Sequence, residues 1–175
     1  MMKGKNMKSI EEYFVLIDPD RRKHLENFHN KNISLINSAK GSKFNHQSWK
    51  GGYRNHLEQC LFIAEHLYKI DVGSINFDSI FMVLYFHDIE KVFNHVFEKV
   101  FHYEMDKDDF LRNSLPTFWK IKLTDEELMA IKYIHGEGDD YRKDARVMNK
   151  LSAFCHACDV FSARITFDKK EMGFR

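Results

Sequence analysis

The sequence predicts an all-α protein, a compact single-domain helical bundle. Three observations lead to this fold class. Apolar residues recur at helical spacing along most of the chain, and the alternation that is typical of β-strands is poor throughout. The chain has 175 residues, only two prolines and no long Pro/Gly/Ser linker, a length that suits one domain with a substantial core.

The first half of the chain predicts three helices. A helix is expected at residues 21–39, because apolar residues follow "DPD" at helical spacing. The glycines of "GSKFNHQSWKGG" end it, and an amphipathic helix follows at residues 53–70. The apolar run "SIFMVLYF" predicts a short buried helix at residues 80–86, which Asp78 or Ser79 can cap.

The second half predicts three more helices. One is expected at residues 91–101, and "MDKDDFLRN" is expected to form a short helix or a loop. Thr124 and Glu127 have the spacing of a capping box, so a helix begins there and runs to about His135, before the next glycine. "GEGDDYRKD" is expected to be a loop. The last helix is expected at residues 144–167.

Composition narrows the class of function. Lys and Arg number 27 and Asp and Glu 26, so a net charge of +1 gives no bulk attraction to nucleic acid or anionic lipid. No apolar stretch approaches the ~18 residues that a membrane helix needs. The three cysteines are an odd number, and "MMKGKNMKSI" lacks the apolar stretch of a secretory leader. We therefore expect a cytoplasmic protein without a membrane span.

The feature that most needs an explanation is the pair His87-Asp88, which ends the apolar run of the third helix. Burying a carboxylate beside an imidazole costs free energy unless something pairs with both. Further candidate ligands end or line other predicted helices: His56, His135, and His156 with Asp159 on one helical face. Histidine and aspartate together suit a borderline-hard divalent ion, so the sequence predicts a metal site.

The order of these residues resembles that of the HD-domain superfamily of metal-dependent phosphohydrolases. "WKGGYRNHLEQC" resembles the "GGLLEH" start of that family's first ligand helix, and "LYFHDIEK" resembles its "LHDIGK". "IKYIHGE" resembles the "HHG" or "HHE" helix end, and "HACDVFSAR" resembles "ADxxSA". The resemblance covers about residues 44–165, which would form the motif-bearing core of one HD domain spanning residues 1–175. Residues 9–40 would be a helical N-terminal extension.

The resemblance implies a set of metal ligands and a reaction. The implied ligands are His56, His87, Asp88 and Asp159, with His135 as a second-metal ligand or a phosphate contact. One or two divalent ions would be bound, chosen among Mn, Co, Ni, Fe, Mg and Zn. The reaction would be hydrolysis of a phosphoester or phosphoanhydride bond in a nucleotide or a similar small phosphate compound.

Further residues receive roles at this site. Asp88 and Lys91 are the implied catalytic residues, and Lys91 resembles the phosphate-contacting lysine of "HDxxK" members. Arg54 is a second candidate phosphate contact, because it lies two residues before His56. Tyr141 and Arg142 lie in the glycine-rich loop after His135, which could form a lid, with the tyrosine stacked on a base.

Two departures keep alternatives open. Glu90 replaces a small residue of "HDIGK" and is expected to face solvent, and the block at His135 has one histidine where many two-metal members have two. One alternative is a di-iron HD-type oxygenase, which would draw on His135 and His156. Another is a nucleotide-binding HD module without turnover.

Near-neutral charge and the lack of an RNA-binding module argue against nucleic acid as a partner. Exposed aromatic residues would support a homo-oligomer.

Overall fold

The computed structural model describes residues 7–42, 47–70, 75–101 and 104–166. The α-helices are α1 (Ile10–Tyr13), α2 (Pro19–Ile36), α3 (Gly52–Tyr68), α4 (Phe77–Phe86), α5 (Glu90–Phe101), α6 (Lys107–Asp109), α7 (Leu115–Trp119), α8 (Asp125–Tyr133) and α9 (Lys150–Phe161). Short 3₁₀ turns are η1 (Phe14–Leu16) and η3 (Gly138–Asp140), and π-helical turns are η2 (Phe110–Ser114) and η4 (Ser162–Thr166). This part of the chain contains no strand, which confirms the all-α prediction.

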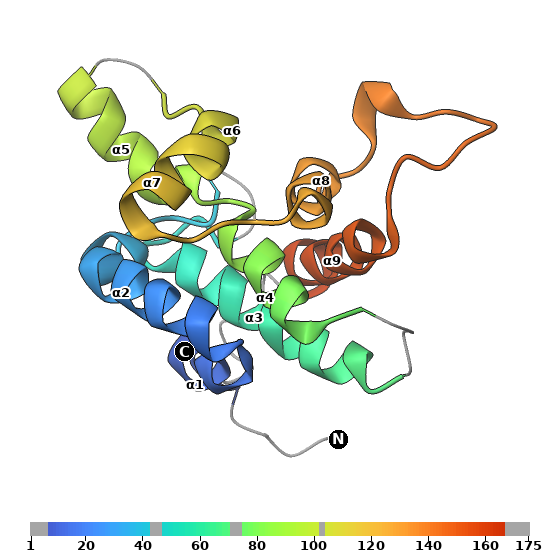
Figure 1. Ribbon diagram of the computed structural model, residues 1–175, viewed down its shortest axis with the longest axis horizontal. Coiled ribbons are helices and arrows are strands. Elements are labelled where there is room, and N and C mark those ends of the chain that lie inside the picture. The colour runs from blue at the N-terminus through green and yellow to red at the C-terminus, as the bar shows by residue number, and fades with distance from the viewer. Residues whose placement is uncertain (1–6, 43–46, 71–74, 102–103, 167–175) are drawn as a thin grey trace.

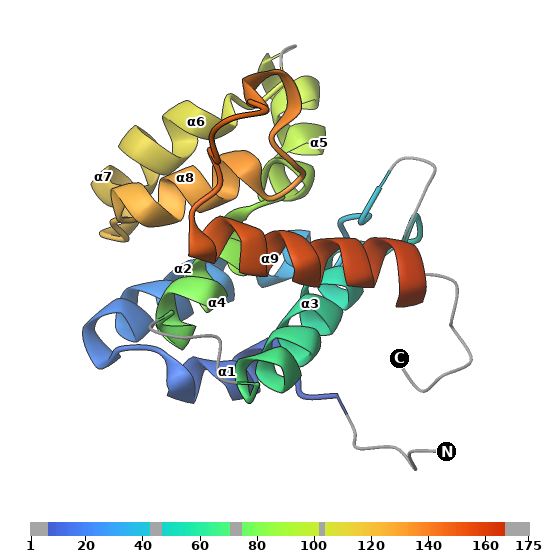
Figure 2. The same cartoon turned by 90° about the vertical axis from the view of Figure 1, so that its right-hand side faces the viewer.

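Helix α4 lies in the middle of the bundle. It packs against α3, α8 and α9, and α9 crosses α3 on the face shown in Figure 2. Every side chain of α4 from Ile80 to Phe86 is buried. A helical stretch that is apolar on every face avoids water only when other elements cover it on all sides, so the central position of residues 80–86 follows from the sequence. Whatever follows α4 therefore emerges inside the bundle.

Capping residues explain where several helices begin. Asp18 accepts hydrogen bonds from the backbone N–H groups of Asp20 and Arg21 and starts α2, with Pro19 in the first helical position. The capping box of Thr124 and Glu127 is present at the start of α8, as predicted.

Two predicted boundaries are wrong. Helix α4 begins at Phe77, because Asn76 rather than Asp78 or Ser79 caps it. Helix α9 begins at Lys150, where Asn149 accepts a hydrogen bond from the backbone of Ser152. The expected start near residue 144 lies in an exposed loop, whose charged residues have no core to face.

One ion-pair network joins three helices. Arg21 of α2 binds Glu127 of α8 with two parallel hydrogen bonds of 2.8 Å each, and it also binds Asp78 of α4. The side chain of Glu127 is fully buried and that of Asp78 is 9% exposed. Because both acids are withdrawn from water, the one guanidinium group has to neutralise them.

No helix among the described residues combines the length and the apolar character that crossing a membrane requires.

Candidate metal centre

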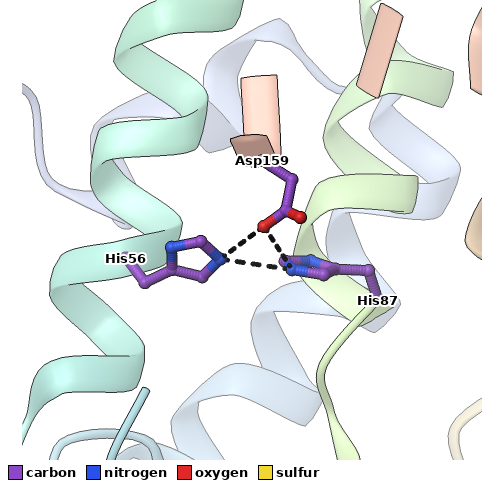
Figure 3. A group of neighbouring side chains, drawn as sticks. All are labelled: His56, His87 and Asp159. Atoms are coloured by element: carbon purple, nitrogen blue, oxygen red, sulfur yellow. Dashed lines mark hydrogen bonds and ion pairs between the residues drawn. The ribbon is translucent and has the colours of Figure 1, made fainter. Parts of the chain in front are cut away.

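Three helices bring His56, His87 and Asp159 together (Figure 3). His56 lies on the buried face of α3, His87 directly follows α4, and Asp159 lies in the last turn of α9. His56 Nε2 lies 3.0 Å from Asp159 Oδ1 and 3.3 Å from His87 Nε2, which is 3.7 Å from the same carboxylate oxygen. Neighbouring ligand atoms on one ion stand about 3 Å apart when the bonds are about 2.1 Å long, so the spacing suits a common ion.

Hydrogen bonds orient both imidazoles. His87 Nδ1 donates to the carbonyl oxygen of Leu84 at 2.7 Å. His56 Nδ1 lies 3.0 Å from Ser162 Oγ, and this hydroxyl donates in turn to Gln59 Oε1. With Nδ1 used as the donor, each ring turns its Nε2 toward the other ring and toward Asp159. Outer partners of this kind select the tautomer that can bind a metal.

Asp88 and His135 form a second group with His87. Asp88 Oδ2 lies 3.3 Å from His87 Nε2, and Asp88 Oδ1 lies 3.5 Å from His135 Nε2. Asp88 is almost fully buried, whereas the side chain of His135 is 52% exposed, so the cluster opens to solvent on the α8 side. Asp88 Oδ1 is buried and accepts no hydrogen bond within the described residues. A buried carboxylate oxygen without a partner is what a cation would satisfy.

The charges of the cluster also fit a cation. Burial by itself lowers the pKa of the His87 imidazole, but the carboxylates of Asp88 and Asp159 outweigh burial and raise that pKa to about 10. Burial raises the pKa of both acids, yet the neighbouring imidazoles hold both below their usual range. The two ionised carboxylates thus favour a proton on His87, and a divalent ion that displaces this proton from Nε2 would supply the positive charge in its place. The residues present fit a divalent ion, with His56, His87, Asp88 and Asp159 as its candidate ligands.

Two lysines lie beside the cluster. Lys91 Nζ contacts Asp88 Oδ2, which agrees with their i,i+3 spacing. Lys107 Nζ donates to the carbonyl oxygen of His87 at 2.8 Å and lies 3.5 Å from Glu90 Oε2. The expectation that Glu90 faces solvent is wrong, because its side chain is only 22% exposed and lies against Lys107. The turn that holds His87 and Asp88 is thus flanked by two cations.

Arg54 has a structural position in place of the expected phosphate contact. Its three guanidinium nitrogens donate to Glu58, Asn37 and Glu11 at 2.8, 2.9 and 2.6 Å. Residues two apart on a helix lie on nearly opposite faces, so Arg54 turns away from the face that carries His56. The guanidinium joins α3 to α1 and to the end of α2.

Tyr141 and Arg142 lie in the loop between α8 and α9, which extends beyond both helices (Figure 1). The loop encloses a hollow of about 350 Å³ lined by both residues, and Tyr141 is 67% exposed. Neither residue belongs to the two metal groups of the described chain. Their contacts with a substrate stay a prediction.

His156 lies outside both candidate metal groups of the described residues. Its Nδ1 donates to the carbonyl oxygen of Ile134 and so ties α9 to the residue before His135. The di-iron alternative draws on both His135 and His156, and only His135 lies in a suitable group. His156 instead helps to hold the end of α8 in place.

Comparison with known proteins does not decide between these interpretations: no family model, no curated protein and no solved structure matches this chain. The case for the site therefore rests on its geometry and on the chemistry of its side chains.

The sequence did not lead us to predict the residues that orient the imidazole of His56. Ser162 lies three residues after Asp159, and Gln59 lies three residues after His56, so each shares a helical face with a candidate ligand. Gln47 extends the chain of contacts by donating to Gln59 Oε1 at 2.8 Å. The i,i+3 spacing is the signal that could have identified Ser162 and Gln59.

A Ser162→Ala variant should bind metal more weakly without unfolding. Loss of the hydroxyl removes the acceptor for His56 Nδ1–H and frees the ring to adopt the wrong tautomer. Outer partners of metal-bound histidines typically contribute about 10- to 100-fold to affinity, and we expect a loss in that range for Mn²⁺ by isothermal titration calorimetry. The exposed Ser38→Ala variant is the matched control and should bind like the wild type. Equal affinity in Ser162→Ala would contradict the assigned role.

Proposed function

We propose that the protein is a metal-dependent phosphohydrolase that acts on a nucleotide or a similar small phosphate compound. The observation that carries the proposal is the convergence of His56, His87 and Asp159 from three helices, with Asp88 beside them. The HD-type order of these residues supports the same class. We propose in addition that the helical fold is of the HD type.

A divalent ion at this site would lower the pKa of a bound water toward ~7 and polarise a phosphoryl oxygen. The chain contributes the rest. The buried apolar helix α4 holds His87 and Asp88 in a fixed place, and the hydrogen bonds to Leu84 and Ser162 fix the ring orientations. Preorganised ligands of this kind need little rearrangement when substrate binds.

Lys91 and His135 are the groups best placed to bind a phosphate. Lys91 uses one of its three ammonium protons for Asp88, and its side chain is 27% exposed, so the other protons can reach a ligand. His135 is the most exposed member of the cluster and lies at the opening. The alternative role of His135 is to hold a second metal together with His87 and Asp88.

The proposal is tested by a screen of nucleotides and small phosphate esters. Each substrate is supplied with Mn²⁺, Co²⁺, Ni²⁺ or Mg²⁺ in turn, and released phosphate is measured. We expect hydrolysis that requires one of these ions and disappears with a chelator. If metal binds but no substrate is turned over, the protein is a binding module. If no metal binds, the site assignment is wrong.

A Lys91→Ala variant should mainly lose phosphate binding. Removing one charge-assisted hydrogen bond to an anion costs about 1.5–3 kcal/mol, which corresponds to a KM raised roughly 10- to 100-fold. Steady-state kinetics with the best substrate of the screen measures the change, and Lys91→Arg should restore part of the binding. The exposed Lys122→Ala variant serves as control. Unchanged kinetics would place Lys91 outside the site.

A further inference from the structure

A second hollow is lined in part by Lys91, the lysine that contacts the candidate ligand Asp88. The hollow has a volume of about 780 Å³ and is lined by the end of α2, the segment that follows it and α5, which contacts α2. Ligand pockets for small molecules typically measure about 300–1,000 Å³. The hollow is therefore large enough for a mononucleotide, and one of its walls begins at the residue that contacts Asp88.

The floor of the hollow is apolar. It consists of Leu35 in the last turn of α2, Ala39 in the segment after α2, and Val92 on α5. All three are at least partly withdrawn from water and belong to or pack against the core, so the floor is firmly held. An apolar surface of this kind suits the flat face of a nucleobase.

One wall carries polar groups in a defined order along α5. Lys91, Asn94 and Glu98 have i, i+3, i+7 spacing and all line the hollow. Seven residues of helix correspond to a rise of about 10 Å. Lys91 and Glu98 are thus about as far apart along the helix as the phosphate and the outer edge of the base are in a nucleoside monophosphate.

Glu104 brings a second carboxylate to this wall. The backbone N–H of the next residue, Met105, donates to Asn94 Oδ1 at 3.0 Å, which holds residue 104 beside α5. Within the described part of the chain, the carboxylates of Glu98 and Glu104 make no ion pair or hydrogen bond, and both residues line the hollow. The third acid on the wall, Glu90, already lies against Lys107.

We propose that this hollow binds the nucleoside part of a nucleoside monophosphate whose base carries an amino group on its hydrogen-bonding edge. The phosphate would lie at Lys91 beside the metal centre, the base on the apolar floor, and the amino group against Glu98 and Glu104. A carboxylate accepts hydrogen bonds only, so it favours the N–H donors of adenine, guanine and cytosine. Uracil and thymine carry two carbonyl oxygens on either side of their single N–H, so a carboxylate repels this edge of the base. Lys40 and Lys50 at the rim attract the anionic ligand.

The placement of the phosphate in this inference rests on the proposed function. Measurements of ligand binding test the inference and do not require turnover. The probes are inorganic phosphate and analogues of AMP, CMP and UMP in which a methylene group replaces the 5′ ester oxygen and blocks hydrolysis, each titrated by calorimetry into the Mn²⁺-loaded protein. We expect AMP and CMP to bind about tenfold more tightly than UMP, the effect of one hydrogen bond to a charged group. Equal binding of AMP and UMP would overturn the base preference.

Three variants locate the binding. Glu98→Gln should lower AMP affinity about tenfold and leave inorganic phosphate unchanged, whereas Glu126→Gln, an exposed acid on α8, should change neither. The Ser38→Trp variant places a large side chain in the hollow from an exposed position. It should weaken the binding of every nucleotide but not the binding of inorganic phosphate. If Glu98→Gln and Ser38→Trp both bind AMP like the wild type, the hollow is not the nucleoside site. Hydrolysis of phosphate esters with these negative results would retain the proposed function and reject only this inference.

Discussion

An Asp88→Asn variant is expected to lose metal binding and phosphate hydrolysis together. The substitution keeps the shape of the side chain but removes the buried charge. Asp88 belongs to the group with His135 and lies 3.3 Å from His87, the residue that both candidate groups share. Because a direct ligand should count for more than an outer partner, we expect a loss of Mn²⁺ affinity beyond about 100-fold. Hydrolysis should fall below detection, because Asp159 is then the only carboxylate left among the candidate ligands.

Thermal unfolding provides a readout that does not depend on turnover. Ligand at 100 times its Kd stabilises a folded protein by about 2.7 kcal/mol, which for a chain of this size raises Tm by roughly 5–10 °C. Wild-type protein should show this rise with Mn²⁺, and Asp88→Asn should not. The exposed Asp139→Asn variant is the matched control and should respond like the wild type. Full activity in Asp88→Asn would show that the site is misassigned.

An Arg21→Ala variant is expected to lose about 3–5 kcal/mol of folding free energy, with no effect on the metal ligands themselves. Arg21 neutralises two buried acids, Glu127 and Asp78, on two different helices. Removing the guanidinium leaves both carboxylates without a counter-charge in a site that water reaches poorly. Urea unfolding measures the loss, and the neighbouring Arg22→Ala variant, which breaks no described ion pair, should cost less than about 0.5 kcal/mol.

A double variant separates lost charge compensation from lost packing. Glu127→Gln retains an oxygen for the capping box with Thr124, because glutamine serves at that position as well as glutamate. In the Arg21→Ala background it removes one of the two unpaired charges, so it should restore part of the stability. If Glu127→Gln destabilises both backgrounds equally, the network does not act through charge.

The fold class was predictable because helical periodicity is a local property. The capping box at Thr124 and the buried character of α4 are both contained in a few consecutive residues, and both agree with the structure. Helix ends were harder to predict. Asn76 and Asn149 are the caps that form, although neighbouring residues of similar propensity were equally eligible from sequence. Contacts with the rest of the bundle decide between such neighbours.

By itself the sequence determined which side chains are available to the site. It places His87 and Asp88 at the end of an apolar helix, Lys91 one turn later, and Asp159 on the buried face of the last helix, because spacing along one helix fixes which residues share a face. Only the tertiary structure decided which of them meet. It brought His56 within 3.0 Å of Asp159, supplied Ser162 as its partner, and turned Arg54 toward Glu11. Those contacts join residues 43–106 positions apart, and they depend on how whole helices pack rather than on any local pattern.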